Sequence, residues 1–198
     1  MLANDRTADK RLRIIQAATA VFSRKGFHKA RVEEIAEEAE IGKGTVYEYF
    51  ASKKELFLEM IFYAHQKYRE FLEQELSKAK TFYDGLQRLF EVTMQFMQRH
   101  KEMALVLMAD HPMIDEEIHK ALRQKEQEQL RFMTGILQDV TRRGEIRPVN
   151  IQAAIMVIFG TLYLVNGQIV FCDKTQEPDF KQLSQDAIDI LMHGLAVK

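Results

Sequence analysis

The sequence has few residues that cross-link a chain or break a helix. Cys172 is the only cysteine, which excludes a disulfide within the chain and fits the reducing cytoplasm. With only 9 Gly and 3 Pro in 198 residues, long helices are favoured. The first thirteen residues carry charge and lack an apolar segment, which argues against a secretory signal. These absences predict a helical protein of the cytoplasm.

The chain also lacks an excess of one charge. Its formal net charge is −1, from 28 Lys and Arg against 29 Asp and Glu, so overall charge does not indicate nucleic acid as a partner. Residues 1–55 hold 11 basic against 9 acidic residues, and residues 56–198 hold 17 against 20. This asymmetry is small, so a prediction of DNA binding has to come from a motif.

One stretch, residues 31–50, has the pattern of two short helices around a tight turn. Val32, Ile35 and Ala39 recur at helical spacing and predict an amphipathic first helix. Residues 40–42 then interrupt the apolar pattern, and a second periodic segment follows directly. The stretch is therefore predicted to be a helix-turn-helix.

The second helix of this pair has one apolar face and two polar faces. Val46 and Phe50 share the face that we expect to be buried. The other two faces carry the side chains of Lys43, Thr45, Tyr47 and Tyr49. Amine and hydroxyl groups of this kind bond phosphate oxygens and base edges, whereas the alternative for the two tyrosines is packing in the core.

The segment KGTVYEYFASKKELF, preceded by RVEEIAEEAEI and a hydrophobic first helix, resembles the DNA-binding domain of the TetR/AcrR family of bacterial regulators. The resemblance covers about residues 9–60, and the rest of the chain is similar only in length and helical character. It implies a homodimeric transcriptional repressor that a small apolar effector releases from a palindromic DNA operator. It also implies an all-α fold of about nine helices, with a three-helix DNA-binding domain at 1–55 and a larger effector-binding and dimerisation domain at 56–198.

The resemblance and the outward faces together assign the DNA contacts. Lys53 stands at the start of a fourth helix, whose N-terminus favours an anion, and by resemblance it binds a phosphate. Glu48 can accept a hydrogen bond from a cytosine amino group, or simply face solvent. Around the helix-turn-helix span Arg31 to Phe50, the predicted DNA-binding residues are Arg31, Gly42, Lys43, Gly44, Thr45, Tyr47, Glu48, Tyr49 and Lys53.

Two positions depart from the family pattern. Arg31 stands where a Thr or Ser usually caps the second helix, which loses a cap worth about 1 kcal/mol and adds a cation for a phosphate. Glu40 stands where a Gly usually permits a positive φ, and a left-handed Glu there costs about 1–2 kcal/mol. We expect Gly42 to absorb part of the bend.

Capping residues and apolar periodicity predict the remaining helices. The first helix is expected to begin after Thr7 as its N-cap and to stop at Gly26. Basic residues near its start, at positions 10, 11 and 13, either contact phosphate or form a solvated face. Further helices are predicted at about 52–77, 81–100, 101–109, 113–143, 150–172 and 179–194.

Residues 149–172 contain no charged side chain, and this uncharged stretch is as long as a membrane span. Because Asn166 and two glutamines in this segment would be costly at a bilayer centre, we instead predict a helix buried on all sides, as at an obligate dimer interface, and no membrane partner. By resemblance, the last two helices pack against their copies in the partner as a four-helix bundle. The predicted interface residues are Ile155, Ile158, Leu162, Leu183, Ala187 and Ile190.

Seven of the ten methionines lie between residues 94 and 156, alongside several phenylalanines. Methionine is adaptable and polarizable, so this set can line a cavity for an apolar effector, and plain core packing is the alternative. The candidate pocket residues are Phe90, Met94, Met97, Met108, Phe132, Met133, Phe159, Tyr163 and Asn166.

Motifs for catalysis are lacking: the sequence has no glycine-rich phosphate loop, no HExxH and no nucleophile elbow. Asp115 and His119 have the spacing of metal ligands, but solvated charges at a helix start explain them more simply. We therefore predict no enzyme activity, no catalytic residues, no cofactor and no metal site. The alternative to a regulator is a soluble helical small-molecule carrier with a vestigial helix-turn-helix.

Overall fold

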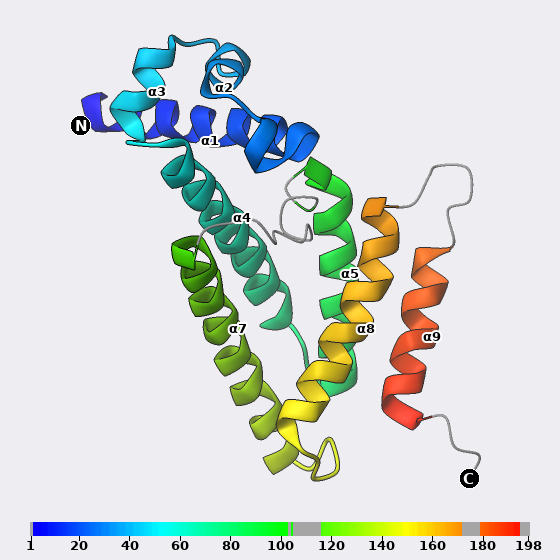
Figure 1. Cartoon of the computed structure of the whole chain (residues 1–198). Coiled ribbons are helices and arrows are strands. Elements are labelled where there is room, and N and C mark those ends of the chain that lie inside the picture. The colour runs from blue at the N-terminus through cyan, green and yellow to red at the C-terminus, as the bar shows by residue number, and fades with distance from the viewer. Residues whose placement is uncertain (1, 103, 105–115, 172–178, 195–198) are drawn as a thin grey trace. The chain divides into compact units, whose positions relative to one another are not determined.

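The computed structural model describes residues 2–102, 104, 116–171 and 179–194, and over these residues the chain forms helices and no strand (Figure 1). The chain divides into two compact units, Met1–Glu70 with His100–Ala109, and Phe71–Arg99 with Asp110–Lys198. The prediction of an all-α protein is therefore confirmed. The described helices are α1 (Leu2–Lys29), α2 (Val32–Glu38), α3 (Lys43–Tyr49), α4 (Lys53–Leu76), α5 (Phe82–Arg99), α7 (Glu116–Arg142), α8 (Ile151–Phe171) and α9 (Phe180–His193).

Helix α1 confirms one predicted boundary and corrects the other. The backbone leaves the helical conformation at Gly26, with φ of 70°, as expected for a glycine stop. The prediction that Thr7 caps the start was wrong, because the helix begins at Leu2 and Thr7 lies inside it. No proline or glycine precedes Thr7, so nothing in the sequence prevents the helix from starting earlier.

The first unit gathers α1, α2 and α3 at the N-terminal end of the chain, shown in blue to cyan in Figure 1. Its core contains Ile14, Ile35, Val46 and Phe50, each at most 1% exposed. Ile35, Val46 and Phe50 belong to the predicted apolar faces of the two helices in residues 31–50. Their burial sets which faces of α2 and α3 remain outside.

The turn between α2 and α3 has the geometry that the sequence predicts. Glu40 has a φ of 56°, the left-handed conformation in which glycine is usual. Gly42 has a φ of −72° and is the N-cap of α3, so the prediction that it absorbs part of the bend through its own freedom was wrong. The turn places its positive φ at Glu40 and tolerates the cost of a side chain there.

Two reciprocal capping arrangements open α4 and α5, as predicted. The Ser52 hydroxyl accepts from the Glu55 N–H at 3.1 Å, and the Glu55 carboxylate accepts from the N–H of Ala51 at 2.7 Å. At α5, the Thr81 hydroxyl accepts from the Asp84 N–H at 3.1 Å. Helix α4 continues from the first unit into the second.

The second unit is a helical bundle in which α8 packs against α5, α7 and α9 (Figure 1). Gly144, with φ of 75°, ends α7, and the side-chain oxygen Oδ1 of Asn150 accepts from the N–H of Ala153 to cap α8. Asp179 caps α9 in the same way. The predicted helix at 101–109 and the predicted start of α7 lie largely outside the described residues.

Helix α8 is buried on one side only in the single chain, so the predicted burial on all sides at a dimer interface would require a partner. Ile155, Ile158 and Leu162 are at most 6% exposed because they face the other helices of their own chain. The opposite face exposes large apolar side chains: Met156, Val157, Tyr163 and Leu164 are 56–69% exposed. The three buried residues named above therefore do not fit a surface for a partner, although Ile190 of α9 is 46% exposed.

The remaining predicted interface residues, Leu183 and Ala187, are half-buried on α9.

Among the described helices, α8 is also long and apolar enough over Ile151–Gln168 to cross a membrane, by length and composition only. The core helix of a soluble protein passes the same test.

Candidate functional site

Helix α3 presents its polar faces outward. Val46 and Phe50 are each 1% exposed, and they hold the helix against the first unit. Tyr47, on the opposite side, is 45% exposed, while Thr45 and Tyr49 are half-buried. Gly44 and Glu48 are exposed, and a side-chain carbon added at Gly44 would meet nothing within 4 Å. The helix thus offers hydroxyl groups and open backbone on a rigid support.

Lys43, the first residue of α3, is paired with an acid from α2. Its amine lies 2.6 Å from a Glu33 carboxylate oxygen, and both side chains are 50% exposed. The shared hydrogen bond lowers the pKa of Glu33 and raises the pKa of Lys43. The same amine lies 5.8 Å from the centre of the Tyr47 ring. Any phosphate that Lys43 binds must compete with Glu33.

Arg31 precedes α2 and is tied to Glu34. The Glu34 carboxylate accepts from the Arg31 backbone N–H at 3.2 Å, and it pairs with the Arg31 guanidinium and with the Lys25 amine, both at 3.0 Å. Hydrogen bonds from Lys25 and from the Arg31 backbone lower the pKa of Glu34 to about 2. Glu34 thus supplies half of a capping box where the usual Thr or Ser is missing.

Two of the three basic residues near the start of α1 also have partners within the first unit. The Arg11 guanidinium pairs with Glu59 at 2.8 Å and lies 4.9 Å from the centre of the Phe50 ring. Arg13 donates to the carbonyl oxygen of Ala39 at 2.8 Å, and this bond connects α1 to the turn before α3. These contacts give Arg11 and Arg13 a structural role.

Lys53 has an environment that the sequence pattern did not predict. Its amine donates to three backbone carbonyl oxygens at the end of α1: Phe27 at 2.8 Å, Ala30 at 3.0 Å and His28 at 3.4 Å. It also lies 4.6 Å from the centre of the Phe27 ring. The lysine expected to bind a phosphate therefore closes the C-terminal end of α1, where helix carbonyl groups carry partial negative charge.

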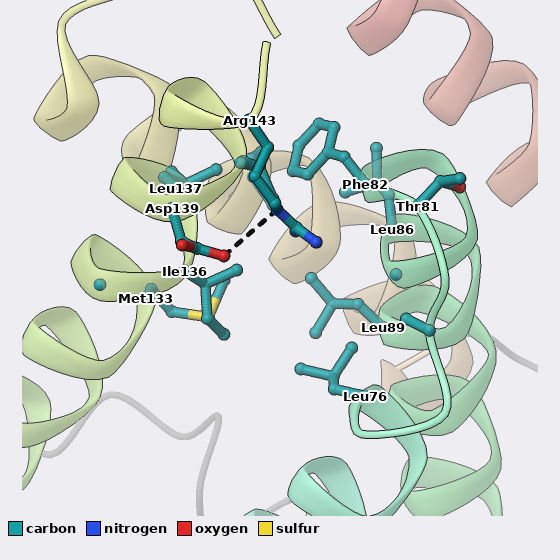
Figure 2. A pocket seen from close by; sticks show the side chains of 15 residues that line it. Leu76, Thr81, Phe82, Leu86, Leu89, Met133, Ile136, Leu137, Asp139 and Arg143 are labelled. Atoms are coloured by element: carbon teal, nitrogen blue, oxygen red, sulfur yellow. Dashed lines mark ion pairs between the residues drawn. The ribbon is translucent and has the colours of Figure 1, made fainter. Parts of the chain in front are cut away.

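The second unit contains an apolar cavity of about 340 Å³, bounded by the end of α4, the start of α5, the end of α7 and α8. In Figure 2, leucines of α4 and α5 face Met133 and Ile136 of α7 across it. Its lining residues are Leu76, Ala79, Thr81, Phe82, Gly85, Leu86, Leu89, Met133, Gly135, Ile136, Leu137, Asp139, Val140, Arg143 and Ile158.

The two charged residues that line this cavity, Asp139 and Arg143, lie in the last turn of α7 and directly after it. Arg143 lies 3.2 Å from Asp139 and 3.1 Å from Glu145, and its side chain is 52% exposed. Figure 2 shows Arg143 projecting beside Phe82, with a dashed line to Asp139. Glu145 also accepts from the backbone N–H of Phe82, which ties the end of α7 to the start of α5. The cavity therefore combines apolar walls with one charged edge.

Of the predicted pocket residues that the structure describes, Met133 alone lines this cavity. Phe90 and Met94 border a separate small groove between α5 and α9. The rest are distributed as follows: Met97 is buried, Phe159 is half-buried, Phe132 and Tyr163 are exposed, and Met108 lies outside the described residues.

Asn166, the polar member of the predicted pocket, is 1% exposed, and its amide donates to the carbonyl oxygen of Leu162. Its side-chain oxygen has no hydrogen-bond partner among the described residues. Methionine content was a poor guide to the cavity, because six of its fifteen lining residues are leucine or isoleucine and one is methionine. A better signal was available in Gly85 and Gly135, which interrupt helical patterns without ending them.

Within the described residues, no group of three or more His, Cys, Asp or Glu side chains is arranged to hold a metal ion. Asp115 and His119 cannot be compared with the prediction, because Asp115 and the side chain of His119 lie outside the described part.

Two family models match the chain. Residues 14–60 match "Bacterial regulatory proteins, tetR family", and residues 79–166 match "Tetracyclin repressor-like, C-terminal domain". The Fatty acid metabolism regulator protein of Bacillus subtilis (strain 168) is 24% identical over 187 residues, which cover 94% of this chain and 95% of that protein. Such relatives are transcriptional regulators rather than enzymes.

Solved structures share the fold. FadR from Bacillus subtilis in complex with stearoyl-CoA superposes with a TM-score of 0.83 at 23% identity, over 93% of this chain and 99% of that one. AibR in complex with isovaleryl coenzyme A and operator DNA gives a TM-score of 0.77 at 14% identity, over 92% and 98% of the two chains. At these identities the likeness shows the arrangement of helices.

Proposed function

Because the chain belongs to the tetR family of bacterial regulatory proteins and is a DNA-binding transcriptional regulator, we propose that α3 binds the operator and that an apolar effector in the second unit releases it. The observation that carries this proposal is the division of α3 into a buried face, Val46 and Phe50, and an exposed face with Tyr47. A short helix so mounted can enter a major groove by its N-terminal residues.

We assign base and phosphate contacts to the outward groups of α3. Tyr47 supplies a ring and a hydroxyl, Thr45 a methyl and a hydroxyl, and Lys43 a charge. Gly44 lets the backbone approach a phosphate. In this proposal residues 1–55 form the DNA-binding domain, residues 56–198 form the effector and dimerisation domain, and α4 connects the two.

The regulator acts as a cytoplasmic homodimer in this proposal. The exposed apolar face of α8, formed by Met156, Val157, Tyr163 and Leu164, and Ile190 on α9 need a cover, and the same face of a second copy supplies one. A two-fold dimer binds a palindromic operator whose half-sites lie about 34–36 Å apart, or a multiple of that spacing.

The effector is an acyl thioester in this proposal. Two relatives of the same fold were solved with stearoyl-CoA and with isovaleryl coenzyme A. The cavity of this chain supports the same chemistry, because its walls are apolar and Arg143 at its edge can approach an anionic head. Effectors of this kind commonly change operator affinity by about 1–3 kcal/mol, the difference between their affinities for the two states.

Replacing Tyr47 with alanine tests the assignment of α3. Tyr47→Ala removes an outward contact group, so operator affinity should fall about tenfold or more while helicity stays unchanged. Fluorescence anisotropy with labelled operator DNA measures this, and wild-type affinity should itself fall steeply with salt. Tyr83→Ala is the matched control, because Tyr83 is also 45% exposed but lies on α5. If Tyr47→Ala and Tyr83→Ala bind the operator with equal affinity, or if wild-type affinity does not change with salt, the alternative function of a small-molecule carrier is favoured.

A further inference from the structure

Lys43, the lysine at the start of α3, is bound to an acid of the neighbouring helix. Its amine lies 2.6 Å from a carboxylate oxygen of Glu33 on α2, and both side chains are 50% exposed. Their hydrogen bond lowers the pKa of Glu33 and raises the pKa of Lys43, so both groups are charged at neutral pH. An acid of the protein itself therefore occupies the cation that α3 offers to a phosphate.

The charge of Glu33 depends on Lys43 more than the charge of the adjacent Glu34 does. The Glu34 carboxylate contacts two cations, Lys25 and Arg31, each at 3.0 Å. Within the described residues, the ion pair of Glu33 is with Lys43. If Lys43 turns to a phosphate, Glu33 is left as an unpaired anion close to that phosphate, and like charges repel.

Sharing the amine does not remove this conflict. A lysine amine has three N–H donors, so Lys43 can donate to Glu33 and to a phosphate together. Two anions on one amine then lie within about 6 Å of each other, where like charges disfavour each other. Whether the amine leaves Glu33 or is shared, the carboxylate lowers the affinity of Lys43 for a phosphate.

We propose that Glu33 is an internal competitor for Lys43 and thereby limits how tightly the regulator holds its operator. The inference rests on the proposed contact of α3 with the operator, and it adds a residue of α2 that sets the strength of that contact. The Lys43 amine also lies 5.8 Å from the centre of the Tyr47 ring, which keeps it on the outward side of α3 without Glu33.

Fluorescence anisotropy on the full-length protein tests this with Glu33→Gln, which keeps the size of the side chain and removes its charge. The probe is a DNA duplex that the wild-type protein selects from a random-sequence library. Glu37→Gln is the matched control, because Glu37 is exposed and lies one turn along the same face of α2. An exposed ion pair interacts weakly, so Glu33→Gln should bind the duplex about two- to fivefold more tightly than Glu37→Gln.

A double-mutant cycle isolates the pair from the general repulsion between acids and DNA. Once Lys43→Gln has removed the amine, Glu33→Gln should strengthen binding no more than Glu37→Gln does. Helicity should stay unchanged in every variant, because buried Val32 and Ile35 hold α2 in place.

The outcomes separate this inference from the proposed function. The inference is overturned if Glu33→Gln binds no more tightly than Glu37→Gln, or if its extra gain persists in the Lys43→Gln background. In either case the operator is still bound, and the proposed function stands. If the wild-type protein enriches no duplex from the library, the proposed function itself fails.

Discussion

Lys53 illustrates at the scale of one residue how contacts decide a role. A lysine amine has three N–H donors, and here three carbonyl oxygens of residues 27, 28 and 30 accept them. Those carbonyl groups lie at the end of α1, where the helix can no longer satisfy them. Binding a phosphate would require the amine to leave them. Lys53 therefore holds the start of α4 against the end of α1.

A salt titration distinguishes this positioning role from a phosphate contact. Lys53→Gln should cost about 1–3 kcal/mol in the free energy of unfolding, because carbonyl groups lose a charged donor. The slope of log affinity against log salt should stay as in wild type, because no phosphate contact is lost. In Lys43→Gln, the comparison variant, the slope should become shallower by about 1. A shallower slope for Lys53→Gln would restore the phosphate contact that the resemblance implies.

At the scale of secondary-structure elements, the turn between α2 and α3 stores backbone strain. Glu40 adopts a φ of 56°, and its carboxylate makes only a 3.9 Å contact with Arg13 while remaining 88% exposed. Such an exposed pair contributes little stability, so it does not offset the left-handed conformation. The turn survives because α2 and α3 are both held by buried residues, among them Ile35 and Val46.

Relieving that strain should stabilise the first unit. Glu40→Gly removes a cost of about 1–2 kcal/mol but gives the unfolded chain more freedom, so the expected gain is about 0.5–1 kcal/mol. Urea unfolding measures it. Glu37→Gly, at an exposed helical position three residues earlier, should lose about 1 kcal/mol. If both variants are destabilised equally, Glu40 is not strained.

At the scale of the whole molecule, α8 is the element with two apolar sides. One side, with Ile155, Ile158 and Leu162, closes the core of its own chain, and the other exposes Met156 and Leu164, each 69% exposed. A large exposed apolar surface on a soluble protein marks an interaction site. In the proposed homodimer, the same face of a second copy covers it.

A charge on the exposed side should prevent assembly. Leu164→Asp places an unpaired carboxylate in the proposed dimer interface and should give monomers in sedimentation velocity, with helicity retained. Gln138→Asp, on the exposed side of α7, should remain as associated as wild type. A dimer that persists in Leu164→Asp would locate the interface elsewhere on the chain.

Much of the fold follows from the sequence because the forces involved act between near neighbours. Helix spacing in residues 31–50, caps at Ser52 and Thr81, and the stop at Gly26 each depend on a few consecutive residues, and the structure has them. The left-handed Glu40 was expected from the resemblance alone, because the family usually has a glycine at that position.

Tertiary structure alone decided the rest. An apolar helix such as α8 has no polar face to orient it, so its sequence does not say that Ile158 points inward and Leu164 outward. The carbonyl partners of Lys53 lie more than twenty residues away along the chain, and four helices contribute to the apolar cavity of the second unit. The local sequence pattern determines where the helices begin and end. Packing determines which face of each helix is buried, because the residues that cover that face lie far away in the sequence.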